Sequence, residues 1–242
     1  MTDRITGLFG RLPALIPAAL HEIEHYFAGS LPAAPATVAV PSVTAWGMGG
    51  NDEYGDCGVI GLGHGFMAAA ADTARAETFP TDAQDVSYYL AYTGGEDDGV
   101  VLSAYLAHVR ANGFYGHTVG AYVPVSVTSL SHIRFATWAY DFCYTGCVVT
   151  AAMMSAFSAG QPWTLEEVQG TPVGGHCVPL VGYDATYLYC VTWGAIQPIA
   201  WSAWDVMASE AWAVMTGELV TAGDDGHGLN LAALQADLAR LN

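Results

Sequence analysis

The sequence predicts an α+β fold with two lobes, because helical patterns fill the first half of the chain and strand patterns fill the second. Hydrophobic residues make up 52% of the 242 residues and charged residues only 12%, which is enough apolar material for a large core. Beyond Gly146 the segments become short and rich in Val, Tyr and Trp, with turn signals between them. We therefore expect a helical N-terminal lobe and an antiparallel β C-terminal lobe.

The helices are expected from their start and stop signals. The clearest one begins at Cys57 and continues at helical spacing to about Ala74, with Asp56 as its expected N-cap. The helix at 100–111 stops at Asn112 and Gly113, a typical C-terminal signal. Further helices are expected at residues 14–28, 82–92, 130–142 and 229–241.

The strands are expected where β-branched and aromatic residues recur between turns. A long loop at 161–175, with two prolines and paired glycines, precedes most of them. The expected strands are residues 148–149, 176–182, 187–192, 196–201 and 211–215.

The charge pattern excludes several function classes. The net charge is −17, and all six basic residues are arginine. No basic patch can form, so we expect neither nucleic-acid binding nor attraction to an anionic membrane. No stretch approaches the roughly 20 apolar residues of a membrane helix. Prolines interrupt the apolar run at 12–20, and we interpret this run as mature sequence rather than a signal peptide.

Cys57 is the strongest candidate for a reactive residue. A polar, turn-forming run at 51–56 leads into it, and the helix expected to begin there places the cysteine at the positive end of the helix dipole. This position favours the thiolate, which is the nucleophilic form of cysteine. The alternative is a buried core cysteine, since cysteine is among the most buried residue types and the chain has five.

His176 is the natural partner for Cys57. It opens an expected strand after Gly174 and Gly175, so it can face a helix terminus of the other lobe across a cleft. An imidazole there would take the thiol proton and produce the nucleophilic ion pair. The alternative is a hydrogen-bonded histidine of the core.

At these residues the chain resembles the papain-like cysteine peptidases over roughly residues 42–216, of the type found in uncharacterised proteins of actinobacterial phages. Asn51 stands six residues before Cys57, where the family has an oxyanion-hole glutamine. The pair Asp98 and Gly99 resembles the family's substrate-binding loop, and Trp193 followed by glycine resembles its Trp-Gly signature.

The resemblance implies a papain-like domain at 42–222, preceded by an N-terminal helix and Pro/Ala linker at 1–41 and followed by a helical tail at 223–242. It also implies a third catalytic residue, an asparagine in the family. Counting from Trp193 places Val191 at that position, and counting from His176 places Thr192 there. The Thr192 hydroxyl would then orient the imidazole. The residues before Cys57 could cover the cleft.

The expected function is a thiol hydrolase of peptide or isopeptide bonds that uses Cys57, His176, Asn51 and Thr192, with Asp98, Gly99 and Trp193 binding substrate. The expected partners are a peptide or protein substrate and virion proteins, and the expected location is cytoplasmic or virion-associated. No cofactor or metal is expected. An acidic loop at 96–98 would favour cationic substrates if it flanks the cleft.

Two alternatives belong to other classes. One is a papain-like scaffold without turnover, acting as a virion structural or binding protein, because the family asparagine is missing. The other is a zinc metallopeptidase, because His21, Glu22 and His25 match the H-E-x-x-H pattern. Glu24 and the proline-rich linker that follows argue against a zinc site. A solvent-exposed helix face with alternating His and Glu explains the same sequence pattern.

Overall fold

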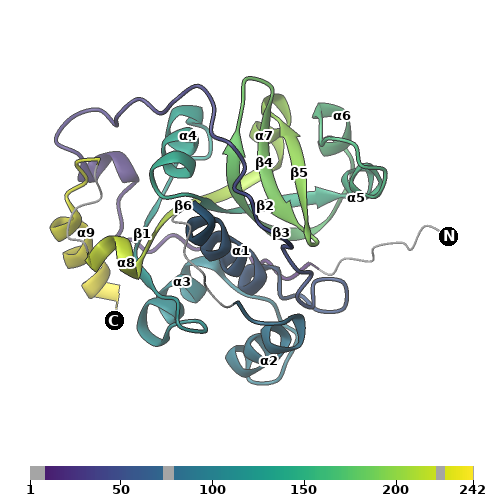
Figure 1. The fold of residues 1–242 in the computed structure, drawn as a ribbon, viewed down its shortest axis with the longest axis horizontal. Coiled ribbons are helices and arrows are strands. Elements are labelled where there is room, and N and C mark those ends of the chain that lie inside the picture. The colour runs from purple at the N-terminus through teal and green to yellow at the C-terminus, as the bar shows by residue number, and fades with distance from the viewer. Residues whose placement is uncertain (1–8, 73–78, 222–226, 242) are drawn as a thin grey trace.

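The architecture is a six-stranded antiparallel sheet with helices packed around it (Figure 1), in a computed structural model that describes residues 9–72, 79–221 and 227–241. The strand order is β1-β6-β2-β3-β4-β5. The α+β prediction is confirmed. N-terminal helices come first in the chain, and the strands of the antiparallel sheet follow them. The strands are β1 Val119–Pro124, β2 Cys143–Thr150, β3 Pro172–Tyr183, β4 Tyr187–Thr192, β5 Ala195–Ala200 and β6 Ala208–Thr216.

The helices of the first half surround one central helix, α1 (Cys57–Asp72), which packs against β3 and β2. Helices α2 and α3 in turn contact α1. These and the other helices are α2 Asp82–Thr93, α3 Leu102–Asn112, α4 Leu130–Ala139, α5 Ala151–Ser158, α6 Leu165–Val168, α7 Trp201–Met207, α8 Gly217–Thr221 and α9 Leu231–Leu238. Short 3-10 helices lie at Ile23–Tyr26 (η1) and Ala239–Leu241 (η2).

Helix α1 is buried nearly all round because its residues are small or apolar on every face. Two of its glycines set how closely it approaches its neighbours. A Cβ on Gly61 would lie 2.9 Å from the sulfur of Cys177 on β3, and one on Gly65 would lie 2.3 Å from the ring of Phe142. Glycine is unfavourable inside a helix, so its use here reflects close packing.

The prediction of a helix at 14–28 is wrong. Only η1 forms there, since Pro13 and Pro17 break the run and remove amide donors. The prediction also missed β1 and the helices α5, α6, α7 and α8, and the loop expected at 161–175 contains α6 and the first residues of β3. Trp201, expected at the end of the strand 196–201, instead begins α7, which follows β5 directly.

Two segments far apart in the sequence, η1 and α9, lie side by side. Helix α9 packs against β1 and η1. The Tyr26 hydroxyl donates to the carboxylate of Asp237 at 3.0 Å. No helix among the described residues is long and apolar enough to cross a bilayer.

Candidate functional site at the start of the first long helix

Cys57 is the first residue of α1, and the turn before it is fixed by a buried carboxylate. Asp56 accepts from the Gly50 N–H at 2.8 Å and from the Asn51 carboxamide at 3.1 Å. The side chain of Asp56 therefore holds the preceding loop in place, where the sequence had suggested a helix cap. Burial raises the pKa of Asp56 to about 6.

His176 lies on β3 and is held from two sides. Its Nε2 shares a hydrogen bond of 2.8 Å with the Thr192 hydroxyl at the end of β4. The indole of Trp193 stacks on the imidazole with ring centroids 4.9 Å apart and planes 18° apart. The other ring nitrogen, Nδ1, is buried and has no hydrogen-bond partner within the described chain.

The turn between β4 and β5 explains the position of Trp193. Thr192 pairs with Ala195, so only Trp193 and Gly194 connect the two strands. Both residues have positive φ, 44° and 73°, as a two-residue hairpin turn of the primed type requires. This tight turn places the indole over the imidazole of His176.

Cys57 and β3 meet where α1 packs on the sheet. The backbone N–H of Cys177, the residue directly after His176, interacts with the Cys57 thiol and acts to lower its pKa. The imidazole belongs to the adjacent position of the same strand. The fold thus brings the start of α1 and the His176 end of β3 together.

A stretch of the chain's own N-terminal region runs across this site. Arg11 donates its backbone N–H to the Gly175 carbonyl at 3.1 Å. The Gly10 carbonyl accepts from the Val100 N–H at 2.7 Å, and the Leu12 N–H donates to the Val100 carbonyl at 2.9 Å. Residues 9–12 therefore lie extended between β3 and the segment before α3, bound on both sides by backbone hydrogen bonds.

Gly10 occupies the narrowest part of this passage. A Cβ on Gly10 would lie 1.5 Å from the Gly55 carbonyl oxygen, and a Cβ on Gly99 would lie 2.2 Å from the Gly10 carbonyl oxygen. The Gly10 backbone N–H interacts with the Cys57 thiol. The Phe9 ring packs perpendicular to the imidazole of His176, with ring centroids 6.0 Å apart. Cys57 and His176 are consequently only 2% and 1% exposed.

Burial sets the protonation of both side chains in this covered state. It raises the pKa of Cys57 to about 11, against the opposing effect of the Gly10 and Cys177 N–H groups. It lowers the pKa of His176 to about 3, and the nearby charge of Arg11 acts in the same direction. Thiol and imidazole are thus both neutral while residues 9–12 stay in place.

The remaining residues expected in the site lie around it in different ways. Asn51 is buried, with its carboxamide N–H bound to Asp56. Gly99 is buried beside Gly10, with φ 74° and its N–H donated to the Tyr89 hydroxyl. Asp98 is exposed. In that loop Asp97 makes the structural contacts, since its carboxylate accepts from the Gly55 N–H and from the Tyr89 hydroxyl.

Comparison with solved structures identifies the fold. Xylellain, a cysteine protease from Xylella fastidiosa, aligns with a TM-score of 0.63 over 89% of this chain and 98% of its own, at 14% identity. This chain has the fold of the papain-like cysteine proteases. The protease and lectin-like domains of Cwp84 from Clostridium difficile align at a TM-score of 0.44 and 9% identity, over 82% of this chain and 56% of that one. No family model and no curated protein matches the sequence.

The residues of the zinc pattern lie outside the site around Cys57 and His176. His21 and His25 stack on each other, with centroids 4.0 Å apart, around a single 3-10 turn. A search of the described residues finds no group of three His, Cys, Asp or Glu side chains that could hold a metal ion. The five cysteines are free and buried.

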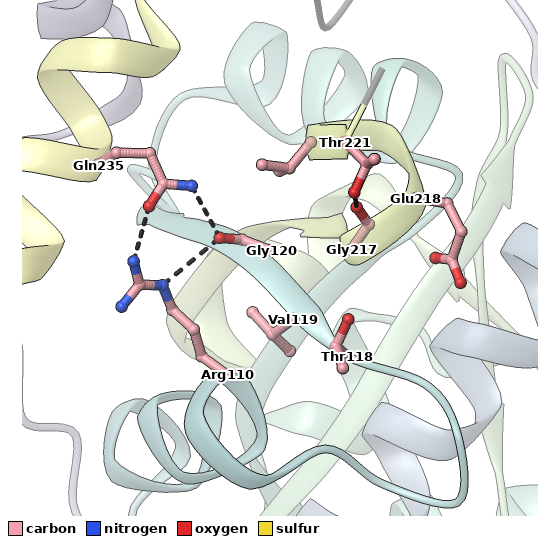
Figure 2. A pocket seen from close by; sticks show the side chains of 9 residues that line it. Arg110, Thr118, Val119, Gly120, Gly217, Glu218, Thr221 and Gln235 are labelled. Carbon is pink, nitrogen blue, oxygen red and sulfur yellow. Dashed lines mark hydrogen bonds between the residues drawn. The ribbon is translucent and has the colours of Figure 1, made fainter. Parts of the chain in front are cut away.

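A cavity of about 800 Å³ lies at another part of the papain-like fold, among α3, β1, α8 and α9 (Figure 2). Arg110 and Gln235 both bind the Gly120 carbonyl and each other, with 2.6 Å between guanidinium and carboxamide. These groups satisfy one another and hold α9 onto β1. Neither Cys57 nor His176 lines this cavity.

Sequence reasoning missed two charged residues of the site, Arg11 and Glu210. Arg11 lies in the stretch that covers Cys57, and its guanidinium pairs with Glu210 on β6 at 2.9 Å. The available signal was a single glutamate inside an otherwise apolar strand pattern. A buried carboxylate of this kind needs a cationic partner.

Proposed function

We propose that the chain is a papain-like thiol hydrolase of peptide or isopeptide bonds, held latent by residues 9–12. One observation carries this proposal. The imidazole of His176 is anchored by Thr192 at Nε2, while Nδ1 is buried without a hydrogen-bond partner in the described chain, and the next residue of the strand, Cys177, interacts with the Cys57 thiol through its backbone N–H. An anchored imidazole with one free nitrogen is what a thiol needs as a general base. The papain-like fold supports a protein or peptide substrate.

The proposed reaction begins once the site is open to solvent. His176 takes the thiol proton, and the Cys57 thiolate attacks the carbonyl carbon of the scissile bond. The imidazolium then gives that proton to the leaving amine, and a thioester with Cys57 remains. Water, activated by His176, hydrolyses the thioester and restores the thiol. Thr192 acts as a positioning residue that fixes the imidazole.

Asn51 and the Cys57 backbone N–H are the proposed donors to the oxyanion. A carboxamide carries two N–H donors, and in Asn51 the Asp56 carboxylate takes one of them. That bond fixes the carboxamide and leaves its second N–H for the developing charge. Asp56 thereby supports the proposed oxyanion site.

Latency follows from the covered geometry. In this state the thiol is neutral, because burial raises its pKa to about 11. Removal of residues 9–12 would restore water around Cys57 and His176 and reverse both desolvation effects. Proton transfer from thiol to imidazole then becomes favourable.

One observation favours a second function, a papain-like scaffold without turnover that serves as a binding or virion structural protein. A threonine stands where the family has an asparagine, and its hydroxyl can serve as donor or acceptor toward Nε2, so it fixes the tautomer of the imidazole less firmly than a carboxamide oxygen, which only accepts. Such a scaffold would keep residues 9–12 in place permanently.

Labelling with iodoacetamide separates the two functions. Gly10→Ala displaces residues 9–12, because its Cβ would overlap the Gly55 carbonyl, whereas Gly29→Ala is a control with open space around the new methyl group. We expect Gly10→Ala to be labelled at Cys57 well before the other four cysteines, with a thiolate present below pH 7. Adding His176→Ala should abolish that selectivity.

The hydrolase proposal fails if the opened chain labels all five cysteines slowly and alike. The scaffold then stands. An epoxide inhibitor of papain-like enzymes gives a second measurement, since its reaction requires the thiolate and a neighbouring imidazolium. Mass spectrometry of peptides that contain Cys57 reads both experiments.

A further inference from the structure

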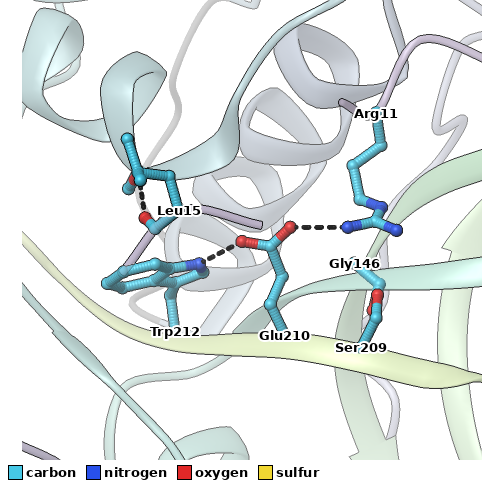
Figure 3. A network of polar contacts seen from close by, with 7 residues as sticks. Arg11, Leu15, Gly146, Ser209, Glu210 and Trp212 are labelled. Carbon is cyan, nitrogen blue, oxygen red and sulfur yellow. Dashed lines mark hydrogen bonds and ion pairs between the residues drawn. The ribbon is translucent and has the colours of Figure 1, made fainter. Parts of the chain in front are cut away.

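A buried carboxylate lies next to the covered site. Glu210 on β6 accepts from the Trp212 indole N–H at 3.0 Å through one oxygen and pairs with the Arg11 guanidinium at 2.9 Å through the other (Figure 3). The side chains of Arg11 and Glu210 are only 8% and 1% exposed. A carboxylate so far from water is stable only with a cation opposite it.

The pocket that holds the guanidinium is built by the sheet itself. Gly146 on β2 pairs with Glu210, and a Cβ on Gly146 would lie 2.5 Å from Cδ of Arg11. Gly175 on β3 forms the next wall, where a Cβ would lie 3.3 Å from Nε of Arg11. Strands β2, β3 and β6 thus form a recess, and glycines line it where the aliphatic part of the Arg11 side chain lies.

Arg11 enters this recess from a backbone segment that is bound in the way an extended peptide would be. Residues 9–12 have neither helix nor regular strand structure and bind through backbone hydrogen bonds to Gly175 and Val100. Gly10 passes Cys57, and Arg11 follows with its side chain pointing toward Glu210 (Figure 3). The recess therefore adjoins the nucleophile, and the backbone path through the cleft leads a side chain into it.

We propose that the recess around Glu210 is a guanidinium subsite of the cleft, filled in the resting chain by Arg11, and that it selects extended peptides carrying arginine once residues 9–12 leave. The selection of substrate rests on the proposed hydrolase function, whereas binding of the guanidinium does not. A neutral side chain would leave Glu210 unpaired in a dry site. The planar guanidinium fits such a carboxylate better than the compact ammonium of lysine.

The binding test uses the full chain with Arg11→Ala. This variant empties the recess and leaves Glu210 without its cation. We expect n-propylguanidinium to raise the melting temperature of the variant saturably, because it restores the pair. The neutral isostere n-propylurea has the same shape without the charge and should give no such rise.

The double variant Arg11→Ala/Glu210→Gln supplies the matched control. It has the same empty recess without the carboxylate, so n-propylguanidinium should no longer shift its melting temperature. An equal response to the urea, or an undiminished response in the double variant, would overturn the proposal. If Arg11→Ala does not fold, the readout becomes the yield of refolding, which n-propylguanidinium should rescue and n-propylurea should not.

The substrate test uses the chain opened by Gly10→Ala. Fluorogenic peptides that differ only by arginine or glutamine at the position entering the recess should differ by about 100-fold in kcat/KM, since the neutral one leaves a buried charge unpaired. Glu210→Gln in the same chain should remove this preference. Hydrolysis without an arginine preference overturns the subsite, whereas guanidinium rescue without any hydrolysis overturns only the hydrolase.

Discussion

His176 is a histidine whose surroundings hold it neutral. Its Nε2 is bound to Thr192, Trp193 covers one face, and burial lowers its pKa to about 3. A lowered pKa means that the folded chain binds this proton less tightly than the unfolded chain does. The corresponding stability is complete above about pH 6.5 and is lost as the pH falls toward 3.

Substitution of His176 should therefore change the acid sensitivity of the protein. At about pH 4 the wild-type imidazole costs on the order of 3 kcal/mol relative to neutral pH, and His176→Gln removes that loss. Urea denaturation at pH 7.5 and at about pH 4 measures the free energy of unfolding for both chains. We expect the free energy of unfolding to fall less for His176→Gln than for the wild type between the two pH values.

His25→Gln is the control, because His25 is an exposed imidazole. It should leave the pH dependence of unfolding close to that of the wild type. A His176→Gln chain that loses as much stability as the wild type between these pH values would show that His176 becomes protonated without opposition.

The residues of the site differ in how far the sequence could predict them. Cys57 and His176 carry local signals, a polar turn before a helix and paired glycines before a strand, and Thr192 follows from its distance to His176. Arg11 carries no local signal, and the only signal for Glu210 is that it is a lone glutamate in a mostly apolar segment. They are 199 residues apart, and only the fold makes them neighbours.

Helix α1 and strand β3 are the elements that build the site, and α1 depends on glycine to approach its neighbours. The prediction of a helix from Cys57 is confirmed, with an observed span of Cys57–Asp72. The β4 prediction at 187–192 matches the observed strand, and the histidine strand extends further at both ends than expected. Strong local periodicity made these elements predictable.

Two glycines of α1 offer a matched pair of substitutions. Gly65→Ala places a methyl group 2.3 Å from the buried Phe142 ring, whereas Gly63→Ala places one 3.4 Å from Phe114, an ordinary contact distance. We expect Gly65→Ala to lower the free energy of unfolding by about 1–3 kcal/mol through overpacking. Gly63→Ala should be neutral or stabilising, because alanine is the better helix former.

Chemical denaturation followed by tryptophan fluorescence measures both variants. Equal stability of the two would contradict the close contact between α1 and Phe142. A destabilised Gly63→Ala chain beside an unaffected Gly65→Ala chain would show that the close contact of α1 lies at Gly63 and not at Gly65.

Elements with weak or broken patterns were predicted poorly. The run at 14–28 has helical spacing of apolar residues, yet two prolines limit it to the 3-10 turn Ile23–Tyr26. Strand β1 was missed, and it is stabilised by pairing with β6 at the far end of the chain. Such long-range pairing has no signature in a local window.

At the scale of the whole molecule, the high net charge determines how salt affects stability. A net charge of −17 in 242 residues means that exposed carboxylates repel one another across the surface. The buried pair of Arg11 and Glu210 is shielded from solvent ions, so salt acts mainly on the exposed carboxylates.

Salt should therefore stabilise the folded chain. Raising sodium chloride from about 0.01 M to about 0.15 M shortens the Debye length from about 30 Å to about 8 Å and weakens the repulsion. We expect the melting temperature to rise by a few degrees. Calorimetry measures the shift, and choline chloride at equal ionic strength should give the same gain. A falling melting temperature, or a gain with one salt only, would contradict general screening.

The sequence by itself determined the α+β class, the central helix with its N-terminal cysteine, and the strand that carries the histidine, because each depends on residues close together in the chain. Only the tertiary structure decided that residues 9–12 cover Cys57 and His176 and that Arg11 pairs with Glu210. Those contacts join segments from opposite ends of the chain. Burial then makes Cys57 and His176 neutral, and burial is a property of the packed molecule.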